Sequence, residues 1–201
     1  MSDAVVVTAK GFSRAKSRLA GALDAEQRSA LARDMFEHVL GAVRACPDIA
    51  RILVATDCDE VADRARQLGA DALMDPPDAD SLGPIVDAAL DHLREQRVQR
   101  AVVLMSDLPR LGPDDVRCMF EVLDTHDAGL APDRASEGTN GLSLHLTPRR
   151  TTCFGHTDSR RRHEAALREL GASVEQVLRP GLAFDVDDVE DVDALDDAAR
   201  S

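Results

Sequence analysis

The sequence contains no tryptophan, no tyrosine and only 5 phenylalanines among its 201 residues. Lysine is nearly as scarce, because Lys10 and Lys16 are the only two lysines among 24 basic side chains. Acidic side chains prevail, and the formal net charge is -13 at pH 7. A chain this acidic lacks the broad basic surface that binds nucleic acid, so we expect no nucleic-acid partner. A local basic pocket for one small anion remains compatible with this charge.

Two further absences concern cysteine spacing and long apolar runs. The four cysteines lie far apart, without the paired spacing of a zinc site. No apolar run reaches the length of a signal peptide or a transmembrane helix. We therefore expect a reduced, cytoplasmic protein without membrane association. With 44% hydrophobic residues, the chain is long enough for one well-buried domain, and we expect residues 1–201 to form a single domain.

Apolar runs typical of buried strands alternate with segments of helical periodicity. This alternation predicts an α/β fold, a mostly parallel sheet flanked by helices. The strands are expected at 4–9, 51–57, 70–75, 101–107, 128–133 and 141–146. We also expect a loop at 76–83, a second loop at 134–140, and a tail from residue 181 that runs as a strand into an acidic helix.

The loop after the first strand reads KGFSRAKSR at 10–18 and contains both lysines. Its four cations, Lys10, Arg14, Lys16 and Arg18, repel one another, which a solvated loop tolerates. The same set suits several phosphate oxygens, because arginine offers a bidentate fork and lysine a movable point charge. The loop is not a Walker motif and lacks GxGxxG. We expect it to bind an anion.

Three aspartates are candidates for holding a cation. Asp107 follows the strand at 101–107, and ligands of open α/β sheets bind outside the carboxyl ends of strands. Asp185 and Asp187 are two positions apart on a segment expected to be extended, so their side chains point to the same side. Two or three such carboxylates can hold Mg²⁺ together with substrate phosphates. The alternatives are a helix-capping Asp107 and a solvated acidic face at 185–188.

A second basic stretch, SRRRHEAALREL at 159–170, begins a predicted helix. Ser159 is a candidate cap, and a helix start with free amides and nearby arginines can bind a small phosphate or carboxylate. Three consecutive arginines point in three directions, so we expect only one of them to face a pocket. His163 is expected to be a core or capping histidine.

Several segments resemble one known family. They are AKSRL at 15–19, DLPRL at 107–111, PDRASEGTNGL at 132–142, the spaced residues Phe154, Gly155, Ser159 and His163, and LAFDVDDVEDV at 182–192. In this order they resemble the 2-phospho-L-lactate guanylyltransferase (CofC/FbiD) family of deazaflavin coenzyme biosynthesis, over nearly the whole chain. The resemblance implies a glycosyltransferase-A-like nucleotidyltransferase fold, and a homodimer.

The resemblance also implies a reaction that joins GMP from GTP to a phosphorylated three-carbon acid and releases pyrophosphate. Family members use 2-phospho-L-lactate, phosphoenolpyruvate or 3-phosphoglycerate. Thr139, Gly155 and Ser159 match the positions that contact the acid, and we add Asn140 to this set. Lys16 and Arg18, with Lys10, are expected to neutralise the triphosphate, while Asp107 and Asp187 hold Mg²⁺. We therefore expect Lys16, Arg18 and Asp107 to be the catalytic residues.

Two departures from the family pattern affect specificity. Gly83 stands where the family usually has an asparagine thought to help hold the nucleotide, so a nucleotidyltransferase using CTP or a sugar phosphate is an alternative. The interval from Gly155 to Ser159 is one residue longer than the common spacing, which predicts a reshaped acid pocket. A non-catalytic nucleotide-binding relative is a further alternative.

Overall fold

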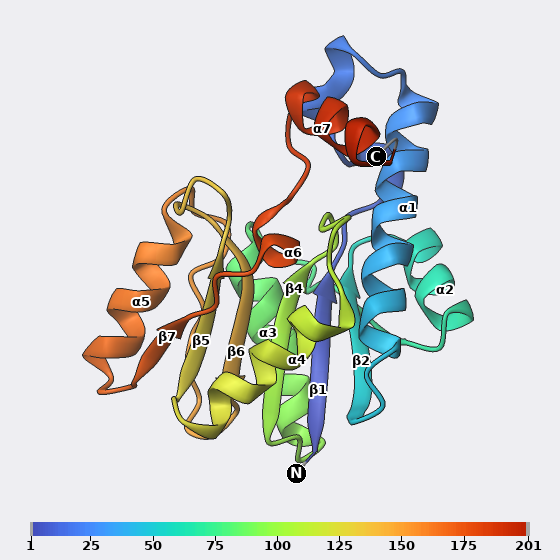
Figure 1. Ribbon diagram of the computed structural model, residues 1–201. Coiled ribbons are helices and arrows are strands. Elements are labelled where there is room, and N and C mark those ends of the chain that lie inside the picture. The colour runs from blue at the N-terminus through green and yellow to red at the C-terminus, as the bar shows by residue number, and fades with distance from the viewer. Residues whose placement is uncertain (1, 200–201) are drawn as a thin grey trace.

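The computed structural model describes residues 2–199, and its central feature is a seven-stranded sheet (Figure 1). The strands are β1 Asp3–Thr8, β2 Ile49–Thr56, β3 Asp71–Met74, β4 Arg100–Met105, β5 Ala128–Pro132, β6 Thr139–His145 and β7 Val174–Gln176. They lie in the order β3-β2-β1-β4-β6-β5-β7, and β6 runs antiparallel to its neighbours β4 and β5 while the other pairs are parallel. The predicted α/β class and mostly parallel sheet are confirmed.

Helices cover both faces of this sheet. The helices are α1 Ala25–Arg44, α2 Asp59–Gln67, α3 Leu82–Glu95, α4 Pro113–Glu121, α5 Ser159–Glu169, α6 Pro180–Ala183 and α7 Val189–Ala199, with 3₁₀ turns η1 Phe12–Arg14, η2 Ser17–Gly21 and η3 Val122–Asp124. Helices α1 and α4 lie on one side of the sheet and α3 on the other (Figure 1). Side chains of α1, α2 and α4 pack into one core layer and those of α3 and α5 into the other. Along β1, Val5 and Val7 belong to the first layer and Ala4 and Val6 to the second, because strand side chains alternate.

The sheet topology places a crevice beside β1. The chain continues from β1 to β2 on one side, whereas β4 pairs with β1 on the other, so the direction of winding reverses between β1 and β4. Open α/β sheets bind ligands at such a point, outside the carboxyl ends of the strands. A small third core of Leu19, Met35, Phe184 and Val186 packs the tail against the loop after β1 and against α1.

Several local predictions were wrong. Thr139 and Asn140 lie inside β6 rather than in the loop before it, because their backbone continues the pairing with β5. The loop expected at 76–83 ends earlier, since α3 begins at Leu82 and includes Gly83. The described part of the tail forms no strand: Pro180 starts the short helix α6, and the residues between α6 and α7 pair with no strand.

Candidate active site

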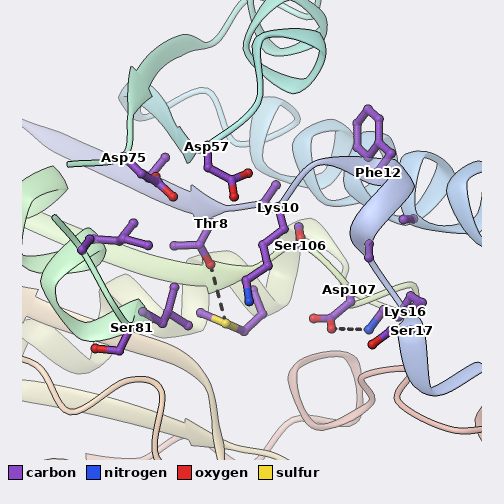
Figure 2. A pocket seen from close by; sticks show the side chains of 18 of the residues that line it. Thr8, Lys10, Phe12, Lys16, Ser17, Asp57, Asp75, Ser81, Ser106 and Asp107 are labelled. Carbon is purple, nitrogen blue, oxygen red and sulfur yellow. Dashed lines mark hydrogen bonds and ion pairs between the residues drawn. The ribbon is translucent and has the colours of Figure 1, made fainter. Parts of the chain in front are cut away.

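A cleft of about 670 Å³ opens at the carboxyl edge of the parallel strands (Figure 2). Thr8 at the end of β1 and Met105 at the end of β4 contact each other in it, with Oγ1 3.7 Å from the sulfur. The loop after β1, the segment 74–82 and the start of α3 supply further parts of the lining. Small-molecule sites typically measure about 300–1,000 Å³, so this cleft is large enough for a nucleotide.

The basic loop after β1 is fixed to the neighbouring strand by Asp57, which follows β2. The Gly11 amide donates to Asp57 Oδ1 at 3.2 Å, and Arg14 lies 2.7 Å from the same oxygen. Phe12 is buried and packs against Phe36 of α1 with ring centroids 5.6 Å apart. The loop therefore holds its cations at a defined place beside the cleft.

Lys16 turns inward and is surrounded by oxygen atoms. Its Nζ lies 2.5 Å from Asp107 Oδ2, 2.5 Å from the Val186 carbonyl oxygen and 3.5 Å from Asp187 Oδ1. The backbone at Lys16 has a left-handed φ of 55°, a conformation that non-glycine residues adopt at a cost and that often marks functional sites. Burial lowers the pKa of Lys16, but Asp107, Asp187 and Asp185 outweigh it and the net pKa is raised.

The three other cations of the basic loop are exposed to different degrees and have different partners. Arg18 is 76% exposed and lies 3.1 Å from Asp187. Lys10 is exposed and lines the cleft, whereas Arg14 is held by Asp57. The solvated loop that the sequence allowed is correct for Lys10 and Arg18 but wrong for Lys16, whose side chain is only 9% exposed.

Asp185 adds a third carboxylate close to this ammonium. Asn140 donates from Nδ2 to Asp185 Oδ1 at 3.2 Å and to the Leu182 carbonyl at 3.0 Å, which fixes the tail beside β6. Burial, with smaller contributions from the charges of Asp107 and Asp187, raises the pKa of Asp185 to about 6 against the opposing Asn140 hydrogen bond. The site thus concentrates negative charge that calls for a cation.

The donor atoms around Lys16 also suit a divalent metal. Within residues 2–199 no three acidic, histidine or cysteine side chains converge on a single metal position. However, Mg²⁺ is commonly bound through one or two carboxylates and completed by substrate phosphates and water. Asp107 and Asp187 already face one ammonium, and a backbone carbonyl joins them, so these hard oxygen donors fit such an ion.

Two of the predicted acid-binding residues, Thr139 and Ser159, form a buried polar cluster with His163, whereas Gly155 is exposed; none of the predicted acid-binding residues lines the cleft. The Cys153 amide donates to His163 Nε2 at 2.8 Å, so Nδ1 carries the proton and donates to Thr139 Oγ1 at 3.1 Å. The Ser159 hydroxyl donates to the same Thr139 oxygen at 3.2 Å. Ser159 is the first residue of α5 rather than its cap, which is Asp158.

His163 is a core histidine, as the sequence indicated. Its ring is 98% shielded and lies edge-on to Phe154, with centroids 4.6 Å apart. Burial lowers the pKa of His163 to about 4, so the ring is neutral at physiological pH. Neither Arg160, paired with Glu164, nor Arg162, paired with Asp158, lines the cleft.

The two glycines at the departures from the family pattern, Gly83 and Gly155, lie where the start of α3 packs closely against the segment before α5. Gly155 has a φ of +90°, and a Cβ there would lie 3.3 Å from the Leu82 amide nitrogen. Gly83 is buried, and a Cβ would lie 3.2 Å from the Phe154 carbonyl oxygen. Gly83 does not line the cleft, whereas its neighbours Ser81 and Leu82 do. In this chain Gly83 therefore allows α3 to pack closely against the backbone at Phe154 and does not contact a ligand in the cleft.

Sequence reasoning missed two cleft aspartates. Asp57 is the first residue after β2 and Asp75 the first after β3, and Asp107 is the second residue after β4. The signal was present, because each ends an apolar run that was recognised as a strand. Applied to every parallel strand, the rule that identified Asp107 would have found both.

Comparison with known proteins decides the family. Residues 3–195 match the family described as Guanylyl transferase CofC like. The chain belongs to this family. It is 38% identical to the phosphoenolpyruvate guanylyltransferase of Conexibacter woesei, over 97% of this chain and 87% of that protein. It is 33% identical to the enzyme of the same name from Chloroflexus aggregans, over 92% and 93%. The protein is a guanylyltransferase, and the resemblance inferred from the sequence is confirmed.

A solved structure agrees with the fold of this guanylyltransferase. A Desulfovibrio desulfuricans protein described as a nucleotide-diphospho-sugar transferase superposes with a TM-score of 0.80 at 19% identity, covering 97% of this chain and 87% of that one. This likeness supports the nucleotidyltransferase type of α/β domain. Among the described residues, no helix is both long and apolar enough to cross a membrane.

Proposed function

We propose that this guanylyltransferase transfers GMP from GTP to 2-phospho-L-lactate or phosphoenolpyruvate and releases pyrophosphate, as a step of deazaflavin coenzyme biosynthesis. The observation that carries the proposal is the cleft in which Lys10, Lys16 and Arg18 meet Asp107 and Asp187. Relatives named phosphoenolpyruvate guanylyltransferase support a phospho-acid acceptor. Four free cysteines are consistent with a cytoplasmic location.

The proposed reaction needs little proton transfer from the protein. The attacking group is a phosphate, largely a dianion near neutral pH because its second pKa is about 6. The protein must instead screen two anions, place them in line and stabilise the leaving pyrophosphate. Lys16 and Arg18, assisted by Lys10, neutralise the triphosphate. Asp107 and Asp187 would hold Mg²⁺, which would supply positive charge for the transferring phosphate.

The acid substrate is assigned to the region of Thr139, Asn140, Gly155 and Ser159. Thr139 Oγ1 accepts from both His163 and Ser159, so its own proton is free to donate to an anion. Asn140 connects this region to Asp185 and hence to the carboxylates around Lys16. The side chains of Thr139, Asn140 and Ser159 are almost fully buried, so the acid needs a local opening to reach them. We favour acids whose phosphate and carboxylate share one carbon, because they suit a compact pocket.

The test is a matrix of nucleotides and acceptors. Purified protein with Mg²⁺ is incubated with GTP, ATP, CTP or UTP and with phosphoenolpyruvate, 2-phospho-L-lactate or 3-phosphoglycerate, and products are read by mass spectrometry and pyrophosphate release. We expect a GMP conjugate of phosphoenolpyruvate or 2-phospho-L-lactate. Products formed from CTP alone, or magnesium-dependent GTP binding without turnover, would contradict the proposal. Preference for 3-phosphoglycerate would contradict the compact acid pocket.

A further inference from the structure

Asp75 lies in the cleft away from Lys16 and Asp107, on the far side of Lys10 (Figure 2). It is the first residue after β3, and its amide donates to the Thr56 carbonyl at 2.9 Å, which fixes it beside the end of β2. Asp75 Oδ1 is fully shielded from water and accepts no hydrogen bond from any described residue. Buried polar oxygens are nearly always bonded, so this one calls for an explanation.

Burial and the neighbouring charge of Asp57 disfavour the ionised form of Asp75. Burial and, to a lesser extent, the charge of Asp57 raise the pKa of Asp75 to about 6 against the opposing charge of Lys10. The carboxylate is therefore held in an unfavourable place in the free protein. Hydrogen-bond donors on a ligand in the cleft would remove that penalty.

Apolar side chains flank Asp75 on the same part of the cleft. The lining there includes Met74, Pro76, Pro77, Leu82 and Ile85. Met74 is 44% exposed, which is unusual for a large apolar side chain in this protein. Methionine sulfur contacts aromatic rings favourably, and proline and leucine offer flat apolar surface. A carboxylate beside such walls suits a planar heterocycle with donors on one edge.

We propose that Asp75 selects guanine by accepting hydrogen bonds from its N1–H and 2-amino group, while Met74 and its apolar neighbours cover the ring. The assignment rests on the proposed use of GTP and names the residue that makes it specific. Guanine presents two adjacent donors on its Watson–Crick edge, whereas adenine, cytosine and uracil each present one donor next to an acceptor. A carboxylate only accepts, so it matches guanine and leaves the other bases with an acceptor facing an acceptor.

The arrangement also agrees with the position of the phosphates. With the base at Asp75, the triphosphate extends past Lys10 towards Lys16 and Asp107, which lie on the other side of the cleft (Figure 2). Base specificity then does not require a side chain at Gly83, which lies outside the lining. Discrimination by a built hydrogen-bonding site exceeds that of an apolar pocket, because a wrong partner leaves buried polar groups unpaired.

The test compares three purines that differ at the 2-position. GTP carries a 2-amino donor, inosine triphosphate carries hydrogen, and xanthosine triphosphate carries a carbonyl acceptor. The wild-type protein should favour GTP over inosine triphosphate by about ten- to hundredfold in kcat/KM and in the Kd measured by calorimetry. In Asp75→Asn that ratio should collapse towards one, and xanthosine triphosphate should become the preferred nucleotide, because the amide offers one acceptor and one donor.

A matched control and the contrary outcomes make the test decisive. Asp78→Asn makes the same chemical change three residues along, at an exposed position outside the cleft lining, and should keep the wild-type ratios. Ratios between nucleotides are measured on one preparation, so partial unfolding does not alter them. A wild-type protein that does not use GTP overturns the proposed function and this assignment together. A wild-type protein that uses GTP, with Asp75→Asn keeping its preference over inosine triphosphate, overturns the Asp75 assignment alone.

Discussion

Lys16 Nζ lies 2.5 Å from Asp107 Oδ2, although 91 residues separate the two in sequence. The same ammonium contacts the Val186 carbonyl, so it joins the loop after β1, the end of β4 and the carboxyl-terminal tail. The residue that we expect to meet the triphosphate therefore also holds three segments together. Changes at this point should affect stability and nucleotide use in the same variant.

Replacing Lys16 by methionine should lower both stability and activity. The variant keeps the apolar stem but leaves Asp107 and Asp187 without the ammonium, and we expect a loss of about 1–3 kcal/mol in the free energy of unfolding. Arg18→Ala should change stability by less than about 0.5 kcal/mol, because Arg18 is largely exposed. Both variants should raise the KM for GTP. Urea unfolding measures the stability and steady-state kinetics the KM. Normal GTP kinetics in both variants would remove these cations from the mechanism.

Asp107→Asn should disable metal-dependent turnover. The amide keeps the shape of the side chain but loses the charge that pairs with Lys16 and, we propose, with Mg²⁺. Activity of the wild-type protein should vanish with a chelator and return with Mg²⁺, whereas Asp107→Asn should fall at least about tenfold and need more Mg²⁺. Asp114→Asn, on the exposed start of α4, is the control. An unchanged magnesium requirement in Asp107→Asn would show that Asp107 is structural.

Thr139→Val and Ser159→Ala should raise the KM for the acid selectively. Thr139→Val removes the hydroxyl proposed to donate to the acid, which costs about 1–3 kcal/mol or about five- to 150-fold, and Ser159→Ala removes the hydrogen bond that orients this hydroxyl. Ser143→Ala is the matched control, because Ser143 is a buried hydroxyl of the same strand, β6, and its Oγ has no hydrogen-bond partner within the described structure. That control should leave both KM values unchanged. Equal losses of GTP and acid affinity would place Thr139 and Ser159 at the nucleotide.

Stability should fall in acid because of His163. An unfolded histidine titrates near pH 6.5, whereas the folded pKa of His163 is lowered to about 4. The folded state resists protonation, so this contribution is fully present above pH 6.5 and is lost as the pH falls from 6.5 towards 4. The loss amounts to at most about 3 kcal/mol. The free energy of unfolding, measured by urea unfolding at several pH values, should depend less steeply on pH in His163→Gln than in wild type or in a His92→Gln control. Identical slopes in all three proteins would contradict the burial of a neutral ring.

Local sequence patterns predicted most of the parallel sheet, because continuous apolar runs reflect strands that are buried on both faces. The predicted strands at 4–9 and 101–107 differ from β1 and β4 by no more than two residues at either end. Gly69 lies just after the end of α2 with a φ of +80°, the conformation of a glycine that terminates a helix. The strand β7 was not predicted, since it has only three residues, two of them exposed, and so carries no periodic signal.

The sequence by itself determined the α/β class, the family, the basic loop with Lys16 and the aspartate after β4, because each depends on residues close together in the chain. Only the tertiary structure decided that Lys16 is buried between Asp107 and Asp187, that Thr139, Ser159 and His163 share one hydrogen-bonded cluster, and that Asp75 faces the same cleft. These relationships join residues from separate strands and from the tail. Their burial, charge and unmet hydrogen bonds arise only when strand order and register bring those segments to one edge of the sheet.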